Sequence, residues 1–303
     1  MKKKIIIGSR RSKLALVYAE RARVELLKNP RIQSVEIKSI TTTGDTIKNV
    51  RVSEHGGKGL FCKTIEQELL NKNIDVAVHA LKDMPTDETE GLLTNCFLER
   101  NNPREILISK DNKNIKELKT NAIVGTSSFR REFQLKNIKK DLVCKLIRGN
   151  VDTRIKKLND NLYDAIILSY AGIKSLGLEE NISQIFSTSE IIPSAGQGVT
   201  ALQCRRNDQD LIEMLDKINH KITHNCIKAE RNVLKVLEGD CETAVGVFAE
   251  VKNDKIILEA ELFSLDGTKR FHVKLSKYSK LAGELGTEVG EILKKQSNNL
   301  YKK

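Results

Sequence analysis

Two segments of the sequence share a pattern of residues suited to binding anions. Residues 5–12 (IIIGSRRS) and 123–131 (IVGTSSFRR) each run from an apolar stretch through a glycine and hydroxyl residues to paired arginines. A strand that enters a helix at such a point presents unpaired backbone N–H groups and the positive end of the helix dipole. Arginine adds a forked, permanently charged donor that matches carboxylate or phosphate. The pattern predicts two anion-binding βα junctions, although each copy alone is also compatible with an ordinary turn.

A carboxylate and further arginines follow other apolar stretches. Residues 75–85 (DVAVHALKDMP) end in Lys82 and Asp83 before a proline, and residues 146–150 (LIRGN) carry Arg148, with Arg154 downstream. Open α/β sheets place ligands at the carboxyl ends of parallel strands, which makes these residues candidates for binding or catalysis. The alternative is that Asp83 caps a turn while Lys82 faces solvent.

Three loops add candidate residues. Residues 56–59 (GGKG) combine a permissive backbone with the cation of Lys58, which favours a mobile loop over a site. Residues 193–198 (PSAGQG) include Gln197 and are typical of a crossover with hinge freedom. Cys241 lies in a glycine-containing loop before a predicted strand. It is a candidate for covalent chemistry, although most cysteines are small buried apolar residues.

Composition narrows the class of protein. The chain has 303 residues, of which 39% are hydrophobic and 30% charged, and a net charge of +12. These values indicate a soluble globular protein of two or three domains with acidic partners. The sequence shows neither a secretory signal pattern nor an apolar stretch of the roughly 20 residues that span a membrane. Its six cysteines include no C-x-x-C pair, so we expect reduced thiols and a cytoplasmic location.

The sequence contains no complete motif for binding a metal or a nucleotide. His220 and His224 are four residues apart, but Lys221 stands where a zinc protease motif would have glutamate. Cys226 nearby keeps a metal site open as an alternative, and we expect none. Neither a Walker A pattern nor G-x-G-x-x-G is present.

The elements that must position these residues follow from apolar periodicity. Strands alternate with helices through residue 200, which favours parallel α/β sheets. Beyond about residue 217 the pattern becomes an α+β unit with an antiparallel sheet. We expect residues 109–121 to form a surface connection and residues 297–303 to fray. The predicted strands are 4–8, 35–41, 74–79, 122–125, 142–147, 163–168, 245–251, 255–264 and 270–276. The main predicted helices follow residues 12 and 59 and cover 222–237 and 281–296. The spacing of four residues predicts one apolar row of Leu14, Tyr18, Ala22 and Leu26 in the first, and one of Phe61, Ile65 and Leu69 in the second.

Five segments, taken in order, closely resemble the porphobilinogen deaminase (hydroxymethylbilane synthase) family. They are residues 78–85 (VHALKDMP), 125–131 (GTSSFRR), 146–150 (LIRGN), 165–168 (AIIL) and 196–198 (GQG). The resemblance covers nearly the whole chain and is strongest through residue 206. It implies a transferase that joins four porphobilinogen units head to tail into hydroxymethylbilane, with release of ammonia, in tetrapyrrole (haem) biosynthesis.

The resemblance also implies a fold and a set of site residues. Two α/β domains, 1–98 with 198–217 and 99–197, would resemble type II periplasmic binding proteins, and an α+β domain, 218–303, would carry the cofactor loop. A dipyrromethane cofactor would be held by a thioether to Cys241, with Asp83 as the catalytic carboxylate and no metal. The implied cofactor contacts are Lys82, Ser128, Arg130, Arg131 and Arg154. The implied substrate contacts are Arg10, Ser12, Thr126, Arg148 and Gln197.

This sequence departs from the family pattern at several positions. The cofactor loop commonly reads GGCQVP in the family and reads GDCETA at residues 239–244 here, and Ser175 stands where arginine is frequent. A non-catalytic anion-binding protein on a periplasmic-binding-type fold is the alternative interpretation, but it gives no reason for Asp83 and Cys241 at their motif positions. A nucleic-acid binder fits less well, because the arginines lie at strand ends and not along one helix face. We expect a monomer that has no nucleic-acid or membrane partner.

Overall fold

The chain folds into two compact units, which are described separately. The computed structural model describes residues 3–46, 59–239 and 243–302. Within these residues the first unit comprises 3–46, 59–101 and 198–224, and the second comprises 102–197, 225–239 and 243–302. No helix in the described ranges is long and apolar enough to span a membrane.

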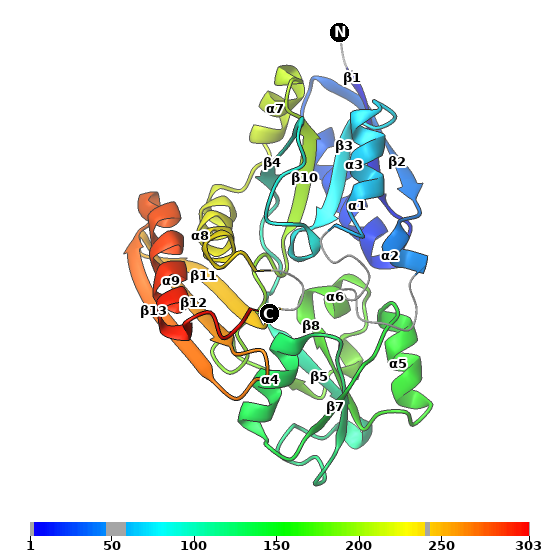
Figure 1. Ribbon diagram of the computed structural model, residues 1–303. Coiled ribbons are helices and arrows are strands. Elements are labelled where there is room, and N and C mark those ends of the chain that lie inside the picture. The colour runs from blue at the N-terminus through cyan, green and yellow to red at the C-terminus, as the bar shows by residue number, and fades with distance from the viewer. Residues whose placement is uncertain (1–2, 47–58, 240–242, 303) are drawn as a thin grey trace. The chain divides into compact units, whose positions relative to one another are not determined.

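The first unit is built on a five-stranded mixed sheet in the order β2-β1-β3-β10-β4 (Figure 1). The strands are β1 (Lys3–Arg10), β2 (Ile32–Ile40), β3 (Val76–Ala80), β4 (Leu92–Phe97) and β10 (Thr200–Arg205). β1 pairs in parallel with β2 and β3, whereas β10 runs antiparallel to both β3 and β4. The parallel strands are the predicted ones, and the antiparallel pair was not predicted.

Helices cover both faces of this sheet. On one face, α1 (Lys13–Leu27) buries the predicted row of Tyr18, Ala22 and Leu26. On the other face, α3 (Lys63–Leu70) buries Ile65 and Leu69. The remaining helices of the unit are α2 (Thr43–Thr46), η2 (Leu81–Asp83) and α7 (Gln209–Asp216).

The second unit contains a sheet of the same topology. Its order is β7-β6-β8-β5-β9, in which β6, β7 and β8 are parallel and β5 is antiparallel to β8 and β9. The strands are β5 (Glu105–Ser109), β6 (Ile123–Gly125), β7 (Val143–Lys145), β8 (Ala165–Ser169) and β9 (Gln184–Ile185). The helices are η3 (Lys110–Asn112), α4 (Phe129–Ile138), α5 (Val151–Asn159), α6 (Tyr170–Ser175) and η4 (Glu179–Asn181). In both sheets an antiparallel strand thus adjoins the third strand of the parallel set.

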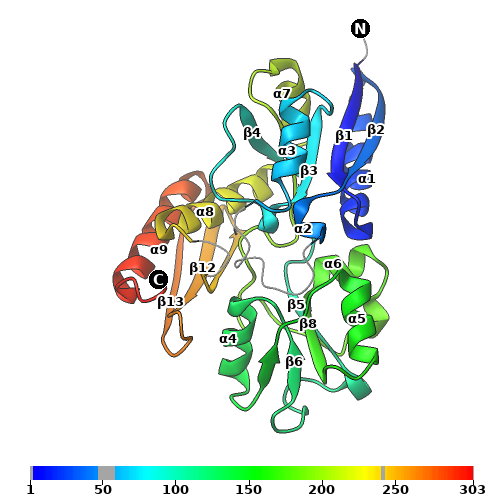
Figure 2. The same ribbon diagram turned by 45° about the vertical axis from the view of Figure 1, so that its right-hand side comes forward.

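The second unit also holds the predicted antiparallel sheet. β11 (Val245–Lys252), β12 (Lys255–Phe263) and β13 (Arg270–Tyr278) form a three-stranded meander. The alternating apolar residues of all three strands share one core with α8 (Lys221–Leu237) and α9 (Ala282–Ser297). These helices therefore cover one face of the sheet (Figure 2), with η5 (Ser279–Leu281) leading into α9.

Two segments are better packed than the sequence suggested. Ile115 and Leu118, in the segment expected to be a surface connection, are buried in the core of the second unit. Tyr301, in the tail expected to fray, is also buried, and its hydroxyl donates a hydrogen bond to the Leu237 carbonyl at 3.1 Å. These residues stand among polar neighbours and form no regular apolar pattern, so the sequence did not predict their burial.

The mixed α/β class with a C-terminal antiparallel sheet is confirmed. The expected second and third domains fall within one compact unit. Their separation into two domains, with the boundaries given above, stays a prediction.

The packing of α9 on α8 gives a test of the C-terminal core. A Cβ at Gly286 would lie 2.1 Å from the Ala229 backbone oxygen, whereas one at Gly283 would meet the flexible end of Lys228 at 2.9 Å. We expect Gly286→Ala to lower the free energy of unfolding by about 1–3 kcal/mol, because the two helices must separate. Gly283→Ala should be neutral or gain up to about 1 kcal/mol from helix propensity. Chemical denaturation measures both, and equal stability of the two variants would contradict this packing.

Candidate active site

Asp83 lies at the carboxyl end of β3, where the chain leaves the first sheet. Buried Leu81 anchors the turn, because its N–H donates to the Val199 carbonyl and its carbonyl accepts from the Met84 N–H, both at 3.0 Å. Met84 is extended, as expected for a residue before proline. Asp83 is exposed and Lys82 half-buried beside it. This arrangement holds a carboxylate at a fixed point of the sheet edge, as the sequence predicted.

A small cavity of about 50 Å³ adjoins this turn. Its lining includes Arg10, Ser12, Phe61, Cys62, His79 and Asp83. The Arg10 guanidinium lies 4.1 Å from the centre of the Phe61 ring, a cation–π contact that orients it. The first anion-binding junction and the Asp83 turn therefore meet at one cavity.

The first βα junction is fixed by its hydroxyl residues. Buried Ser9 donates to the Ala15 carbonyl at 3.1 Å, and the Ser12 hydroxyl accepts from the Ala15 N–H at 3.3 Å as the N-cap of α1. Arg10 ends β1 half-buried, and Arg11 is exposed. Ser12 has a capping role that sequence reasoning did not assign, and its contact with substrate stays a prediction.

The second junction uses the same kind of bonds. The Thr126 hydroxyl accepts from the Ser128 N–H at 3.1 Å, and the Ser128 hydroxyl caps α4 by accepting from the Arg131 N–H at 3.4 Å. Thr126 is buried, with 2% of its surface exposed. Both hydroxyls therefore shape the turn, whether or not they also touch a ligand.

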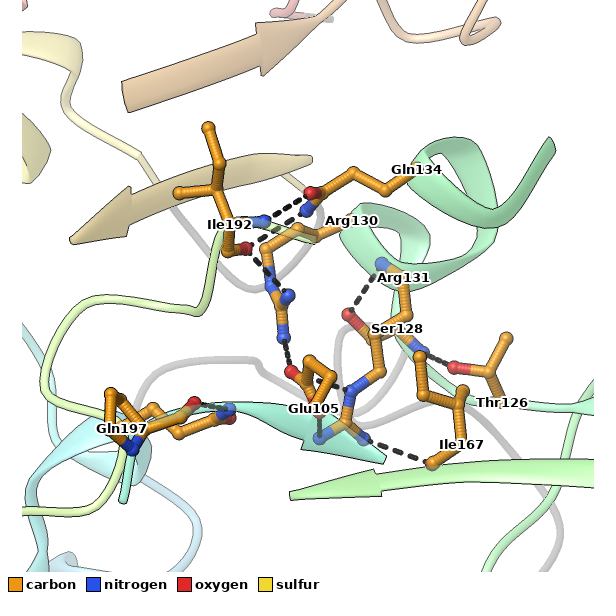
Figure 3. Close-up of polar contacts among 10 residues, drawn as sticks. Glu105, Thr126, Ser128, Arg130, Arg131, Gln134, Ile167, Ile192 and Gln197 are labelled. Carbon is orange, nitrogen blue, oxygen red and sulfur yellow. Dashed lines mark hydrogen bonds and ion pairs between the residues drawn. The ribbon is translucent and has the colours of Figure 1, made fainter. Parts of the chain in front are cut away.

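Arg130 and Arg131, which the family resemblance implied as cofactor contacts, are buried. Both guanidinium groups bind Glu105 of β5 (Figure 3): Arg130 Nη2 donates at 2.7 Å to Oε1, and Arg131 Nη2 at 2.8 Å to Oε2. Arg130 Nη1 also donates to the Ile192 carbonyl at 2.9 Å. Burial lowers the pKa of Arg130, and Glu105 opposes that shift. Both arginines belong to the first turn of α4. From there the Arg130 side chain contacts β5 and the segment at Ile192, and the Arg131 side chain contacts β5.

The loop after β7 carries the third arginine site. The Arg154 Nε atom donates to the Gly149 carbonyl at 2.8 Å, and Lys157 Nζ donates to the Arg148 carbonyl at 3.1 Å. Gly149 has φ +117°, a conformation that favours glycine. Arg148 on the loop and Arg154 on α5 are both half-buried, so each keeps accessible surface.

The remaining predicted residues have different surroundings. Gln197 is fully buried, and its side-chain amide donates to the Pro103 carbonyl at 2.7 Å. This bond links the crossover segment 193–198 to the backbone at Pro103. Lys58 and Cys241 lie outside the described residues. The helix before Cys241, α8, ends at Leu237, and the strand after it, β11, begins at Val245.

The histidine pair has local partners. His220 Nδ1 lies 2.8 Å from the Thr223 hydroxyl, and His224 Nδ1 lies 3.0 Å from the Asn219 amide nitrogen. In the ranges that the structure covers, no three His, Cys, Asp or Glu side chains gather as metal ligands.

Sequence reasoning missed Glu105 and Glu230. Glu230 is fully buried in α8 and accepts from the Gly196 N–H at 2.7 Å and the Ala249 N–H at 2.8 Å. The only signal for Glu105 was an acid at the head of the apolar run EILIS. For Glu230 the signal was an acid on the apolar face of a helix.

The fold and site define an α/β protein with arginine-bearing βα junctions and a carboxylate at a strand end. Two family models match: "Porphobilinogen deaminase, dipyromethane cofactor binding domain" over residues 5–213 and "Porphobilinogen deaminase, C-terminal domain" over residues 224–295. The chain belongs to the porphobilinogen deaminase family, whose members are transferases. This membership does not favour a non-catalytic anion-binding protein.

Bacterial relatives span almost the same length. A porphobilinogen deaminase of Desulforamulus reducens is 42% identical over 295 residues, covering 97% of this chain and 95% of that protein. One of Chlorobium phaeobacteroides is 39% identical, covering 99% and 97%. Among solved structures, a putative methionine-binding lipoprotein of Bacillus subtilis aligns with a TM-score of 0.46 and 16% identity, over 72% of this chain and 90% of that one.

Burial of the Glu105 cluster changes what we expect of its variants. Arg131→Leu removes one of the two guanidinium groups that bind the buried Glu105 carboxylate, so it should lower the free energy of unfolding by about 3 kcal/mol. Arg148→Leu removes a half-buried loop arginine and should cost less than about 1 kcal/mol. Urea denaturation of the two variants is the measurement. A stable Arg131→Leu protein would show that the cluster contributes little to folding.

Proposed function

We propose that this chain condenses four porphobilinogen units into hydroxymethylbilane and releases ammonia at each step. The observation that carries the proposal is the exposed Asp83 carboxylate at the end of β3, beside a cavity that Arg10 also lines. This turn lies within the residues that match the family's cofactor-binding domain. We also propose a monomer that works in the cytoplasm.

The basic groups suit substrates that carry carboxylates. Each porphobilinogen has an acetate and a propionate, so the growing product accumulates negative charge. We propose that Arg10, Lys82, Arg148 and Arg154 bind these groups directly, since each keeps accessible surface. Ser12, Thr126 and Ser128 orient the N–H groups of the two junctions, and Gln197 holds the crossover.

Arg130 and Arg131 have a less direct part in this proposal. Two guanidinium groups and one Glu105 carboxylate give these three residues a formal charge of +1, and the Glu261 carboxylate also acts on Arg130. That charge lies at the start of α4, where the helix dipole is also positive. The pair therefore favours a carboxylate at this junction while Glu105 fixes its geometry.

Asp83 is assigned the catalytic role. Loss of ammonia leaves a cationic pyrrole derivative, and a fixed carboxylate stabilises such a cation by charge and by accepting pyrrole N–H bonds. It can also carry protons during deamination. When bound through Cys241, a dipyrromethane supplies the pyrrole to which the first substrate is joined, and its carboxylates match the arginine and lysine donors named above.

The covalent attachment has a direct test. Intact mass spectrometry of the purified protein should show the sequence mass plus two pyrrole units. Cys241→Ser should lack the addition, whereas Cys144→Ser should keep it, because Cys144 belongs to β7 and not to the segment 239–244. Active wild-type protein with an unmodified mass would contradict the assignment.

The role of Asp83 predicts a separate defect. Asp83→Asn should keep the fold and the two-pyrrole addition, while the rate of product formation falls on the order of 10²–10³-fold because the charge is lost. Asp87→Asn, an exposed carboxylate in the same loop, is the matched control and should retain the wild-type rate. Single-turnover assays with porphobilinogen provide the measurement, and equal rates in the two variants would rule out Asp83.

A further inference from the structure

A chain of buried hydrogen bonds runs from the Asp83 cavity into the first unit. Nε2 of His79 lies 3.2 Å from Oε1 of Gln203, and Nε2 of Gln203 donates at 3.0 Å to Oε1 of Glu66. The Thr89 hydroxyl donates at 2.8 Å to the other Glu66 oxygen. His79, Gln203 and Glu66 are all at least nine-tenths buried. Neither the sequence patterns nor the roles proposed above explain this polar chain.

The chemistry of the chain sets the direction of each bond. An ionised carboxylate only accepts, so Gln203 must turn its NH₂ group toward Glu66 and its oxygen toward His79. His79 must then donate through Nε2, which leaves Nδ1 of the neutral ring as an acceptor. Within the described part of the chain, no hydrogen bond occupies Nδ1.

The surroundings of this ring favour its uncharged form. Burial lowers the pKa of His79, Arg10 reinforces the shift, and Glu66 and Asp83 oppose it. His79 lines the same cavity as Asp83, Arg10 and Cys62. A volume of about 50 Å³ is enough for water, which can link the imidazole to a substrate at Asp83.

We propose that His79 is a proton acceptor of the Asp83 site, and that Gln203 and Glu66 are positioning residues that hold its proton on Nε2. The proposal rests on the proposed function. When a carbon–carbon bond joins two pyrroles, the attacked ring carbon must lose its hydrogen as a proton while the bonding electrons return to the ring. Nδ1 of His79 takes that proton through water and passes it to the released ammonia, which leaves as ammonium.

This division of labour separates two demands on the site. Asp83 must be a carboxylate while the cation is present, so a neutral base beside it can take the proton of the coupling step without removing that charge. The imidazolium formed is offset by Glu66 through Gln203. The chain of hydrogen bonds thus connects Nε2 of His79 to the counter-charge of Glu66, while Nδ1 of the same ring serves as the base.

Kinetics of matched variants test the proposal. His79→Gln can still donate to Gln203 but cannot act as a base, so kcat should fall about 10²-fold with little change in KM. His272→Gln alters an exposed histidine on β13 and should match the wild type. Intact mass first establishes that every variant carries the two-pyrrole addition. Wild-type kcat in loaded His79→Gln protein would overturn the proposal.

The hydrogen-bond direction has a readout independent of turnover. Long-range ¹H–¹⁵N spectra of histidine-labelled protein should show His79 as the Nε2–H tautomer, identified by its loss in His79→Gln. Glu66→Gln permits Gln203 to reverse, so it should weaken this preference and lower kcat about tenfold. An Nδ1–H tautomer in the wild type would overturn the proposal. Failure of the wild type to carry dipyrromethane or make hydroxymethylbilane would instead refute the proposed function.

Discussion

The buried carboxylate of Glu105 is the interaction on which the second unit most depends. Two adjacent guanidinium groups repel each other and lose hydration on burial, and only a carboxylate with matching geometry offsets both costs. Glu105 does so from β5, while Arg130 and Gln134 extend the contact to Ile192 (Figure 3). The charged cluster of Glu105, Arg130 and Arg131 therefore links the start of α4 to β5 and to the segment at Ile192. Any shift of α4 would leave a charge buried without its partner.

The two arginine-bearing junctions look alike in sequence but differ in structure. In the first, the N-cap Ser12 follows the arginines, so Arg10 and Arg11 precede α1. In the second, the N-cap Ser128 comes before them, so Arg130 and Arg131 belong to α4 and face the sheet. The position of one hydroxyl residue thus decides whether an arginine pair is accessible or buried. A similar motif in another sequence should be interpreted only after its helix cap has been located.

Sequence reasoning succeeded where apolar periodicity was long. The parallel strands, the amphipathic rows of α1 and α3, and the whole α+β region agree with expectation because each buries several residues at regular spacing. It missed β4, β5 and β10, which are short or mixed with polar residues and gain their place by pairing with distant strands. Asp83 and Arg10, both singled out from the sequence, line one cavity, and their roles stay predictions. The sequence could not foresee that Glu105 binds Arg130 and Arg131. Such partners are distant in sequence, so no local spacing reveals them.

The place of β10 in the first sheet has a consequence for the order of folding. β10 fills the gap between β3 and β4, yet it follows the entire second sheet along the chain. During synthesis, β5 to β9 can pair as soon as they emerge, whereas one edge of β3 stays unpaired until residues 200–205 arrive. Unpaired strand edges invite pairing with other chains, and contacts of large sequence separation form slowly. The strand that leads to Asp83 therefore keeps an edge open to misassembly until the whole of the second sheet has been synthesised.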